Sequence, residues 1–177
     1  SATYPSSFML AAAMNPCPCG YYGHPTRACT CSPSAVDRYR QRISGPLLDR
    51  IDLHIEVSPV EYDDLASETG GECSADIRAR VLAARAIQQK RYQGTEVRCN
   101  AQIPSARLRG ICRMEPAAAK LLRQAFTGLE LSARTYDRIL RVSRTIADLA
   151  GSETILAVHV SEALQYRALD RKYWYNQ

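Results

Sequence analysis

The spacing of hydrophobic residues divides the chain into two regions. Phe8–Met14 is a short, continuous apolar run, which predicts a buried strand of a parallel sheet, although its length also allows a helix. Ile51–Val57 alternates apolar and polar residues and predicts a second strand, whose inner face would carry Ile51, Leu53, Ile55 and Val57. From Ala75 onward the apolar residues recur at helical spacing instead.

Helix start and stop signals refine this pattern. Ser32 and Pro33 predict the N-cap and first turn of a basic helix that ends at Ile43. Ser74 and Ser132 are the predicted caps of two longer helices, with apolar faces formed by Ile77, Val81, Ala84 and Ile87 or Gln88 and by Ile139, Val142, Ile146 and Leu149. The predicted helices of the second region cover residues 75–92, 104–112, 116–128 and 132–150, and a last one runs from His159 or Ser161 to Leu169.

These elements predict an α/β segment followed by an all-α segment, in a chain that is mostly helical. We expect an α/β region over residues 1–65, a polar linker over residues 66–74, a helical region over residues 75–169 and a tail over residues 170–177.

Composition is that of a globular protein, with 177 residues and 46% apolar residues. No apolar run reaches the roughly 20 residues that a membrane helix needs, so no membrane partner is expected. The N-terminus has neither the pattern of a signal peptide nor an initiator methionine, which predicts an excised fragment of a cytoplasmic protein.

The net charge of +5 comes almost entirely from arginine, because lysine occurs only as Lys90, Lys120 and Lys172. Arginine binds planar anions such as phosphate through a fork of donors, so the composition favours a phosphate-bearing partner. A high-GC genome that encodes arginine in place of lysine explains it equally well.

Four of the seven cysteines lie close together, at Cys17, Cys19, Cys29 and Cys31. Two cysteine pairs joined by a Gly- and Pro-containing loop can surround one structural, tetrahedral zinc ion, with His24 as a spare ligand. The one-residue spacing within each pair is tighter than usual, and a redox pair or unliganded cysteines are the alternatives. Four cysteine ligands would leave no open position for catalysis.

Three polar residues are candidates for binding a phosphate group. Asn15 follows a predicted buried strand, where open α/β sheets place ligand-binding groups, although it can also simply close a turn. Arg50 lies between Asp49 and Asp52, where a helix meets a strand, so it can be held rigidly and still point outward. Arg134 lies in the first turn of a predicted helix, where backbone N–H groups attract anions. By contrast, Arg138 and Arg141 are expected on a solvated face.

The order of these pieces resembles the second half of an AAA+ ATPase module of the clade of magnesium chelatase subunit I and the MCM helicases. The motifs Ala12-Ala-Met-Asn-Pro-Cys-Pro-Cys-Gly20 and Arg42-Ile-Ser-Gly-Pro-Leu-Leu-Asp-Arg-Ile-Asp-Leu53 resemble more closely the bacterial magnesium-chelatase-like proteins called ComM or YifB. The resemblance covers essentially the whole chain, including Leu131–Arg134 and His159–Arg167.

The resemblance implies a role for each candidate. Asn15 would be sensor 1, which positions the attacking water, and Arg50 would be the arginine finger that reaches the nucleotide of a neighbouring subunit. Arg134 would be the sensor 2 arginine of a helical lid. It also implies ATP and Mg²⁺ as cofactors, a ring oligomer of hexameric type, and DNA branch migration as the function of the full-length protein.

The chain departs from the family pattern in one respect. It contains no Gly-Lys followed by Ser or Thr, and no apolar strand that ends in Asp-Glu, and the family places both motifs upstream of residue 1. The chain is therefore predicted to be inactive alone. Two alternatives stay open: a zinc-knuckle nucleic-acid-binding module with a helical bundle and no link to ATP, and a helical interaction domain whose cysteines are incidental.

Overall fold

The computed structural model describes residues 2, 8–60, 62, 66 and 71–167, and these residues form helices and loops. The chain divides into two compact units, Ser1–Ser44 and Gly45–Gln177. The mostly helical character predicted from the sequence is confirmed, whereas the predicted domain limits stay a prediction. The predicted tail over residues 170–177 and residues 67–70 of the predicted linker lie outside the described residues. No described helix is long and apolar enough to span a bilayer.

The two predicted strands are wrong for this chain. Residues 8–14 and 51–57 form no strand, and their apolar side chains are exposed except that of Ile51, as Met9 and Val57 show with exposed fractions of 92% and 86%. A strand exists only where a neighbouring backbone completes a ladder of hydrogen bonds. The described part of the chain offers no such neighbour, and alternation alone cannot create one.

The first unit contains one described helix, α1 (Pro33–Arg40), which follows the cysteine loop. Ser32 is its N-cap, as predicted, and its hydroxyl accepts a hydrogen bond from the backbone N–H of Ala35. Pro33 occupies the first helical turn, where its missing N–H costs nothing. The helix ends at Arg40, three residues before the predicted end.

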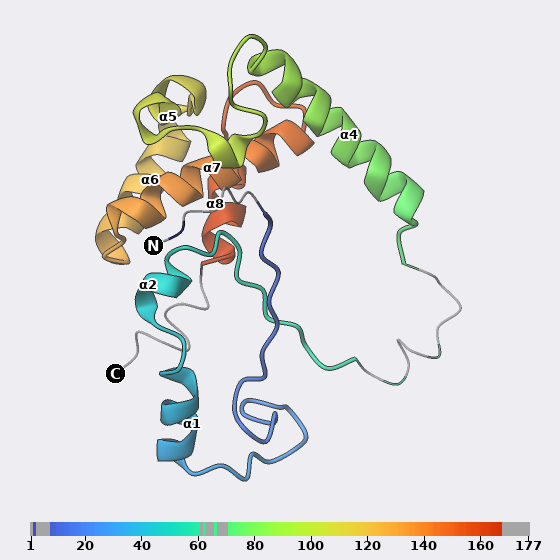
Figure 1. Cartoon of the computed structure of the whole chain (residues 1–177), viewed down its shortest axis with the longest axis vertical. Helices are drawn as coiled ribbons and strands as arrows, with labels where there is room; N and C mark the ends of the chain where they lie inside the picture. Colours follow the sequence, from blue (N-terminus) through green and yellow to red (C-terminus); the bar gives the residue numbers. More distant parts are fainter. Residues whose placement is uncertain (1, 3–7, 61, 63–65, 67–70, 168–177) are drawn as a thin grey trace. The chain divides into compact units, whose positions relative to one another are not determined.

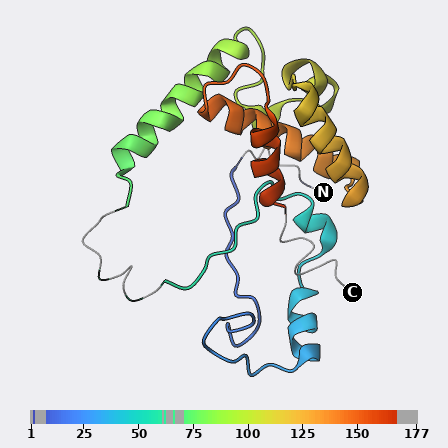
Figure 2. The same cartoon turned by 180° about the vertical axis from the view of Figure 1, so that it is seen from behind.

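The second unit contains the remaining described helices (Figures 1 and 2). They are α2 (Gly45–Leu48), α4 (Ser74–Arg91), α5 (Ser105–Ile111), α6 (Pro116–Gly128), α7 (Ala133–Leu149) and α8 (Ala157–Gln165), with a 3₁₀ turn η1 (Asn100–Gln102). The predicted limits of α6 are correct, and those of α4, α5 and α7 differ by one residue at each end. Ser132 caps α7 as predicted, but Cys73 rather than Ser74 precedes α4.

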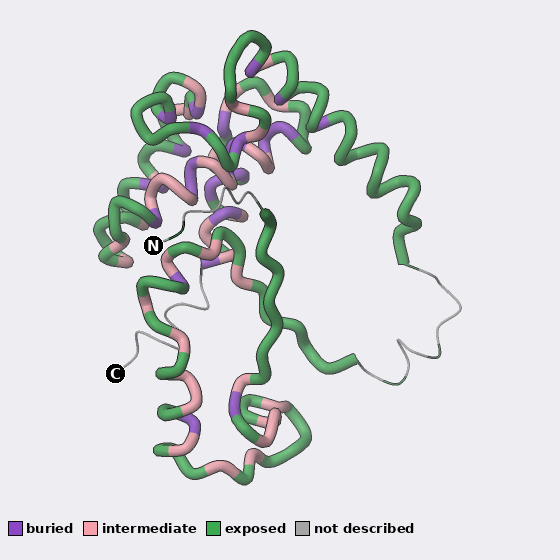
Figure 3. Tube along the Cα trace, in the orientation of Figure 1, coloured by how far each residue is buried: buried purple, intermediate pink, exposed green. Residues whose placement is uncertain are grey.

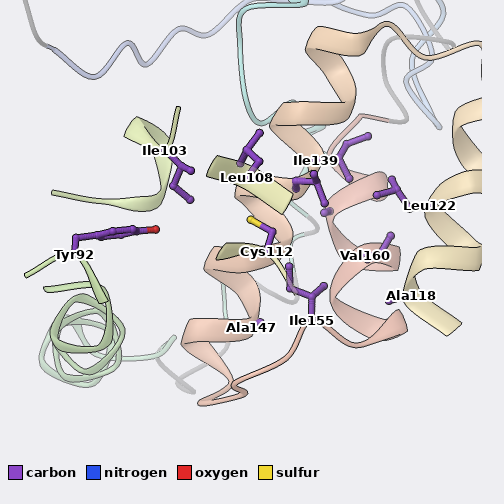
Figure 4. Packing of buried hydrophobic residues seen from close by; sticks show 12 residues of the cluster. Tyr92, Ile103, Leu108, Cys112, Ala118, Leu122, Ile139, Ala147, Ile155 and Val160 are labelled. Carbon is purple, nitrogen blue, oxygen red and sulfur yellow. The ribbon is translucent and has the colours of Figure 1, made fainter. Parts of the chain in front are cut away.

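The core of this unit lies where α5, α6, α7 and α8 meet (Figure 4). Its members are apolar side chains with almost no exposed surface, including Leu108, Leu122, Ile139, Ile155 and Val160. Two backbone hydrogen bonds join the loop before α8 to the loop before α6. Ile155 N–H donates to the Arg113 carbonyl over 2.9 Å, and Glu115 N–H donates to the Ile155 carbonyl over 3.1 Å. α8 is thereby fixed at its N-terminal end and packs against both α6 and α7.

The buried face of α7 differs from the one its apolar residues predict. Ile139 is buried, and Val142 and Ile146 pack against the core, but Leu149 is 42% exposed. Arg144 and Asp148 are fully buried instead. Their side chains form an ion pair and a hydrogen bond with each other, which allows two charged residues to lie on the buried face of the helix.

This buried charge pair belongs to a network between α4 and the C-terminal end of α7. Arg91 and Asn100 both donate to the Asp148 carboxylate, each over 2.8 Å. Arg144 also donates to the Glu153 carbonyl over 2.7 Å. Burial raises the pKa of Asp148, but the hydrogen bonds from Arg91 and Asn100 outweigh it, so the pKa lies below its usual value.

The N-terminal half of α4 does not use its predicted apolar face within this unit. Ala84 and Gln88 are buried, whereas Ile77, Val81 and Ile87 are 41%, 44% and 38% exposed. Figure 3 shows this part of α4 as a largely exposed helix, and Figures 1 and 2 show it projecting from the other helices of the unit. The contact of α4 with the unit is made at its C-terminal end, through Arg91 and Tyr92.

Candidate functional site

Arg50 follows α2 in a tight turn. Pro46 in the first turn of α2 favours the helix, which is only one turn long. Backbone hydrogen bonds continue the turn, from Arg50 N–H to the Leu47 carbonyl over 2.9 Å and from Ile51 N–H to the Leu48 carbonyl over 3.0 Å. Leu48 is buried. We call residues 48–54 the Arg50 segment.

The Arg50 side chain is exposed. Its guanidinium donates one hydrogen bond, to the Pro46 carbonyl over 2.8 Å. Since a guanidinium has five N–H donors, most of its donor capacity is available to a further acceptor.

The two carboxylates beside Arg50 in the sequence are paired with other residues. Asp49 lies 3.7 Å from the Arg167 guanidinium and accepts a hydrogen bond over 3.5 Å from the Thr135 hydroxyl. Asp52 forms an ion pair with Arg138 of α7. Neither aspartate forms an ion pair with Arg50 in the described structure, so the positive charge of Arg50 is not consumed by its sequence neighbours.

Arg134 is exposed in the first turn of α7. The adjacent Ser132 hydroxyl accepts the Thr135 N–H over 3.1 Å, which orders this end of the helix. Because the next residue, Thr135, contacts Asp49, the segments that carry Arg50 and Arg134 lie side by side. Two exposed arginines are therefore placed on neighbouring segments of one unit.

Asn15 belongs to the other unit and is exposed. It lies beside Gly20, since a Cβ added to Gly20 would be 3.8 Å from the Asn15 side-chain nitrogen. Asn15 thus precedes and borders the cysteine loop. Its expected role as sensor 1 stays a prediction, as do the roles of Arg50 and Arg134.

The four cysteines of the first unit converge. The Sγ atom of Cys17 lies 3.4 Å from that of Cys19 and 3.7 Å from that of Cys29, and Cys19 and Cys29 are 3.5 Å apart. With Cys31, all four sulfur atoms lie within 4.8 Å of one another. His24 is not part of this cluster; its Nδ1 accepts the backbone N–H groups of Thr26 and Arg27.

These distances fit a tetrahedral metal site. A zinc ion with bonds of about 2.3 Å to four sulfurs places the sulfurs about 3.8 Å apart, whereas a disulfide needs about 2.05 Å. The observed 3.4–3.7 Å separations match the first geometry, and all four thiols are free. Residues Cys17, Cys19, Cys29 and Cys31 could therefore hold a metal ion.

The loop favours thiolate at one of these positions. Backbone hydrogen bonds from Tyr21 and then Thr30 lower the pKa of Cys19 to about 5, so this sulfur is ionised at neutral pH. The pKa of Cys29 rises to about 12, because burial and the neighbouring sulfurs outweigh a backbone hydrogen bond from Cys31. A cluster in which close sulfurs resist ionising together is stabilised by a cation.

Glycine shapes the turn between the cysteine pairs. Gly20 and Gly23 have φ values of +85° and +79°, a region that favours glycine. Gly20 N–H donates to the Cys17 carbonyl over 3.0 Å, which folds Cys19 back toward Cys17.

Reasoning from the sequence missed the contacts of three arginines, of which Arg138 and Arg167 hold the Arg50 segment. Arg138 and Arg141 were expected on a solvated face, and this is wrong: Arg138 pairs with Asp52, and Arg141 donates to the Ile103 carbonyl over 2.9 Å. Arg167 was not singled out at all, yet it is 95% buried and contacts the segment directly. Its only sequence signal is a lone arginine at the end of an otherwise amphipathic helix.

The sequence of the chain is similar to that of known proteins of one family. The family described as "Magnesium chelatase, subunit ChlI" matches residues 1–65, and "Magnesium chelatase, subunit ChlI C-terminal" matches residues 71–167. Similar relatives include the protein YifB of Escherichia coli, 43% identical over 96% of this chain, and the competence protein ComM of Haemophilus influenzae, 44% identical over 95% of it. A Mycobacterium tuberculosis protein, Rv2897c, is 37% identical over 94% of the chain.

These matches, which together cover most of the chain, show that it is a magnesium-chelatase-like protein. The chain belongs to the magnesium chelatase subunit ChlI family and is similar to its ComM and YifB members. It spans about a third, 32%, of the length of these relatives.

Proposed function

We propose that this chain supplies the arginine finger and lid of an ATP-driven ring motor, in which Arg50 completes a nucleotide site held mainly by a neighbouring copy. The observation that carries this proposal is the pairing of Asp49 with Arg167 and of Asp52 with Arg138, which leaves the exposed Arg50 charge unneutralised by them. A protein that used Arg50 only for its own stability would have two carboxylates in place to bind it.

The chemistry of phosphoryl transfer explains the need for such a residue. Negative charge spreads over the γ-phosphate oxygens in the transition state, and an arginine supplied by a neighbouring subunit stabilises it. Arg134, on the adjacent segment, would contact the same nucleotide's phosphates as sensor 2, and Asn15 would position the attacking water as sensor 1. ATP and Mg²⁺ would be held by a phosphate loop and an acidic pair outside this chain.

The proposed substrate of the motor is DNA, which it would remodel by branch migration. The basic, arginine-rich composition fits a partner with a phosphate backbone. One of the relatives carries the name competence protein. The cysteine cluster would hold one structural zinc ion, because its sulfur geometry matches four-thiolate coordination.

The test is the ATPase activity of the full-length protein. Arg50→Ala should lower kcat about 10³-fold or more with little change in KM, since finger contacts are made in the transition state. Arg134→Ala should also lower kcat. Arg123→Ala, which removes an exposed arginine from α6, is the control and should leave kcat unchanged.

Mixing variants tests whether Arg50 acts on a neighbouring copy. Arg50→Ala subunits mixed with subunits whose phosphate loop is disabled should regain activity, because some interfaces then combine an intact loop with an intact finger. Full activity of Arg50→Ala alone would refute the proposal.

A zinc-knuckle nucleic-acid-binding module is the second candidate. The unit that carries the cysteine cluster also has two arginine–aromatic pairs: the Arg27 guanidinium lies 4.2 Å from the Tyr21 ring centre and that of Arg40 lies 4.4 Å from the Tyr22 ring centre. Such pairs suit stacking with bases and contact with phosphates. Under this alternative, Arg50→Ala leaves ATPase unchanged, whereas Arg27→Ala weakens DNA binding.

A further inference from the structure

We propose that Arg167 is a positioning residue that holds the Arg50 segment in its active orientation; this inference rests on the proposed role of Arg50. Arg167 lies just beyond the C-terminal end of α8, far from Arg50 in the sequence. Its side chain is only 4% exposed. The guanidinium is directed at the turn that presents Arg50.

The contacts of Arg167 lie on both sides of Arg50. One guanidinium nitrogen donates to the Ile51 carbonyl over 2.6 Å and to the Leu48 carbonyl over 3.5 Å. The other terminal nitrogen lies 3.7 Å from the Asp49 carboxylate. The residues before and after Arg50 are therefore tied to one rigid, planar group.

The backbone next to Arg167 extends this attachment. The carbonyl of Tyr166 accepts a hydrogen bond from the His54 N–H over 2.9 Å. Tyr166 and Arg167, which directly follow α8, thus contact the Arg50 segment at four places from Leu48 to His54. No regular element provides these bonds, because the segment is not a strand.

The anchor itself is firmly packed. Val160 and Ala163 of α8 are buried in the core, and α8 packs against α6 and α7. Figure 1 shows α8 behind α7, with the chain that follows α2 running past its C-terminal end. A guanidinium fixed to this helix can hold an exposed turn in one place.

Positioning of this kind has a large effect on rate. Displacing a reacting or charge-stabilising group by about 1 Å can cost on the order of 10²-fold in rate. Without Arg167, the turn that presents Arg50 loses its hydrogen bonds to the end of α8. Asp49 also loses a cationic partner and becomes free to pair with Arg50. Both changes reduce the transition-state contact of Arg50 rather than ground-state binding of ATP.

The experiment is a double-mutant cycle in the full-length protein, measuring kcat and KM for ATP. Arg167→Ala is expected to lower kcat about 10-fold to 100-fold with KM nearly unchanged. In the Arg50→Ala background, the same substitution should cause no further loss, because the residue through which Arg167 acts is gone. Arg167→Lys, which keeps the charge but not the planar fork, should retain more activity than Arg167→Ala.

The control for general destabilisation is Arg91→Ala, which weakens the network at the opposite end of α7. It should lower the unfolding temperature without lowering kcat at temperatures where the protein stays folded. If Arg167→Ala does not fold, the comparison is made with Arg167→Lys in both backgrounds.

The possible outcomes separate the inferred role of Arg167 from the proposed role of Arg50. An equal loss of kcat from the Arg167 substitution with and without Arg50 would show a merely structural role and overturn the inference. A normal kcat for Arg167→Ala, together with a large loss for Arg50→Ala, would also overturn it while leaving the proposed function intact. A normal kcat for Arg50→Ala would remove the proposed function itself.

Discussion

Arg138 of α7 forms an ion pair with Asp52, two residues beyond Arg50. The Arg138 side chain is 20% exposed and that of Asp52 is 49% exposed, so the pair lies near the surface. Exposed pairs of this kind contribute about 0.2–1 kcal/mol to stability. The pair engages the Asp52 carboxylate with a residue other than Arg50.

The first prediction concerns this ion pair. Arg138→Ala should leave the free energy of unfolding within about 1 kcal/mol of the wild type but lower the ATPase kcat of the full-length protein, because Asp52 is released toward Arg50. Adding Asp52→Asn should restore kcat, since the neutral amide no longer attracts the guanidinium. Steady-state kinetics of the three variants checks this, and a double variant no better than Arg138→Ala would contradict it.

The second prediction concerns metal content. Freshly purified, reduced protein should contain one zinc ion per chain, and Cys29→Ser should lower the affinity strongly, because a thiolate ligand is lost. The exposed Cys73 lies outside the cluster, so Cys73→Ser is the matched control and should keep its zinc.

Acid should release this zinc. Zinc binds thiolates, and the pKa of Cys29 is raised to about 12 and that of Cys31 is also raised, so protons compete with zinc for these sulfurs and affinity should fall steadily as the pH decreases from neutrality. Elemental analysis after dialysis at decreasing pH measures the effect. Protein that is free of zinc at neutral pH would mean that the cysteines have another role.

The third prediction concerns the buried carboxylate of Asp148. Asp148→Ala should lower the free energy of unfolding by about 3–5 kcal/mol at neutral pH, because Arg144 is left as a buried charge without its carboxylate partner. Denaturant unfolding of the variant and the wild type checks this value.

The pH dependence of this effect follows from the lowered pKa of Asp148. A carboxyl group whose pKa is lower in the folded than in the unfolded state stabilises the fold above its unfolded pKa of about 3.9. The difference between wild type and Asp148→Asn should therefore be constant near neutral pH and shrink as the pH falls below about 4. A difference that grows on acidification would contradict the assignment.

The fourth prediction is that the isolated 177-residue chain does not hydrolyse ATP. It contains no Gly-Lys-Ser or Gly-Lys-Thr sequence to cradle the phosphates. A phosphate-release assay on the purified chain measures this directly. Hydrolysis that persists in the Arg50→Ala chain would place the nucleotide chemistry elsewhere in the fold.

Local signals in the sequence were sufficient for most of the helices and for the cysteine cluster, although α2 was not predicted and α8 begins and ends earlier than predicted. Ser32 and Ser132 accept hydrogen bonds as N-caps, and α6 begins at Pro116 and ends at Gly128, because caps and breakers act on their own neighbours. Four cysteines within a span of fifteen residues converge for the same reason, since a short loop with two glycines can bring them together.

Tertiary structure decided two features that the sequence pattern did not reveal, namely whether a segment forms a strand and which charged residues are buried. Ile51–Val57 alternates like a strand but forms none, because a strand depends on a hydrogen-bonding neighbour and not on its own sequence. Arg144 and Asp148 can both be buried because they form an ion pair with each other. The spacing of apolar residues along the sequence does not reveal such a pair.

The sequence by itself determined most of the helices, the four-cysteine cluster and Arg50 as a candidate phosphate ligand, since each depends on residues close together in the chain. Only the folded chain revealed that Arg138 and Arg167, more than 80 residues away, pair with the aspartates that flank Arg50. How far the charge of an arginine is neutralised depends on every charged or polar group within a few ångströms of it. Packing between distant segments of the chain decides which groups those are.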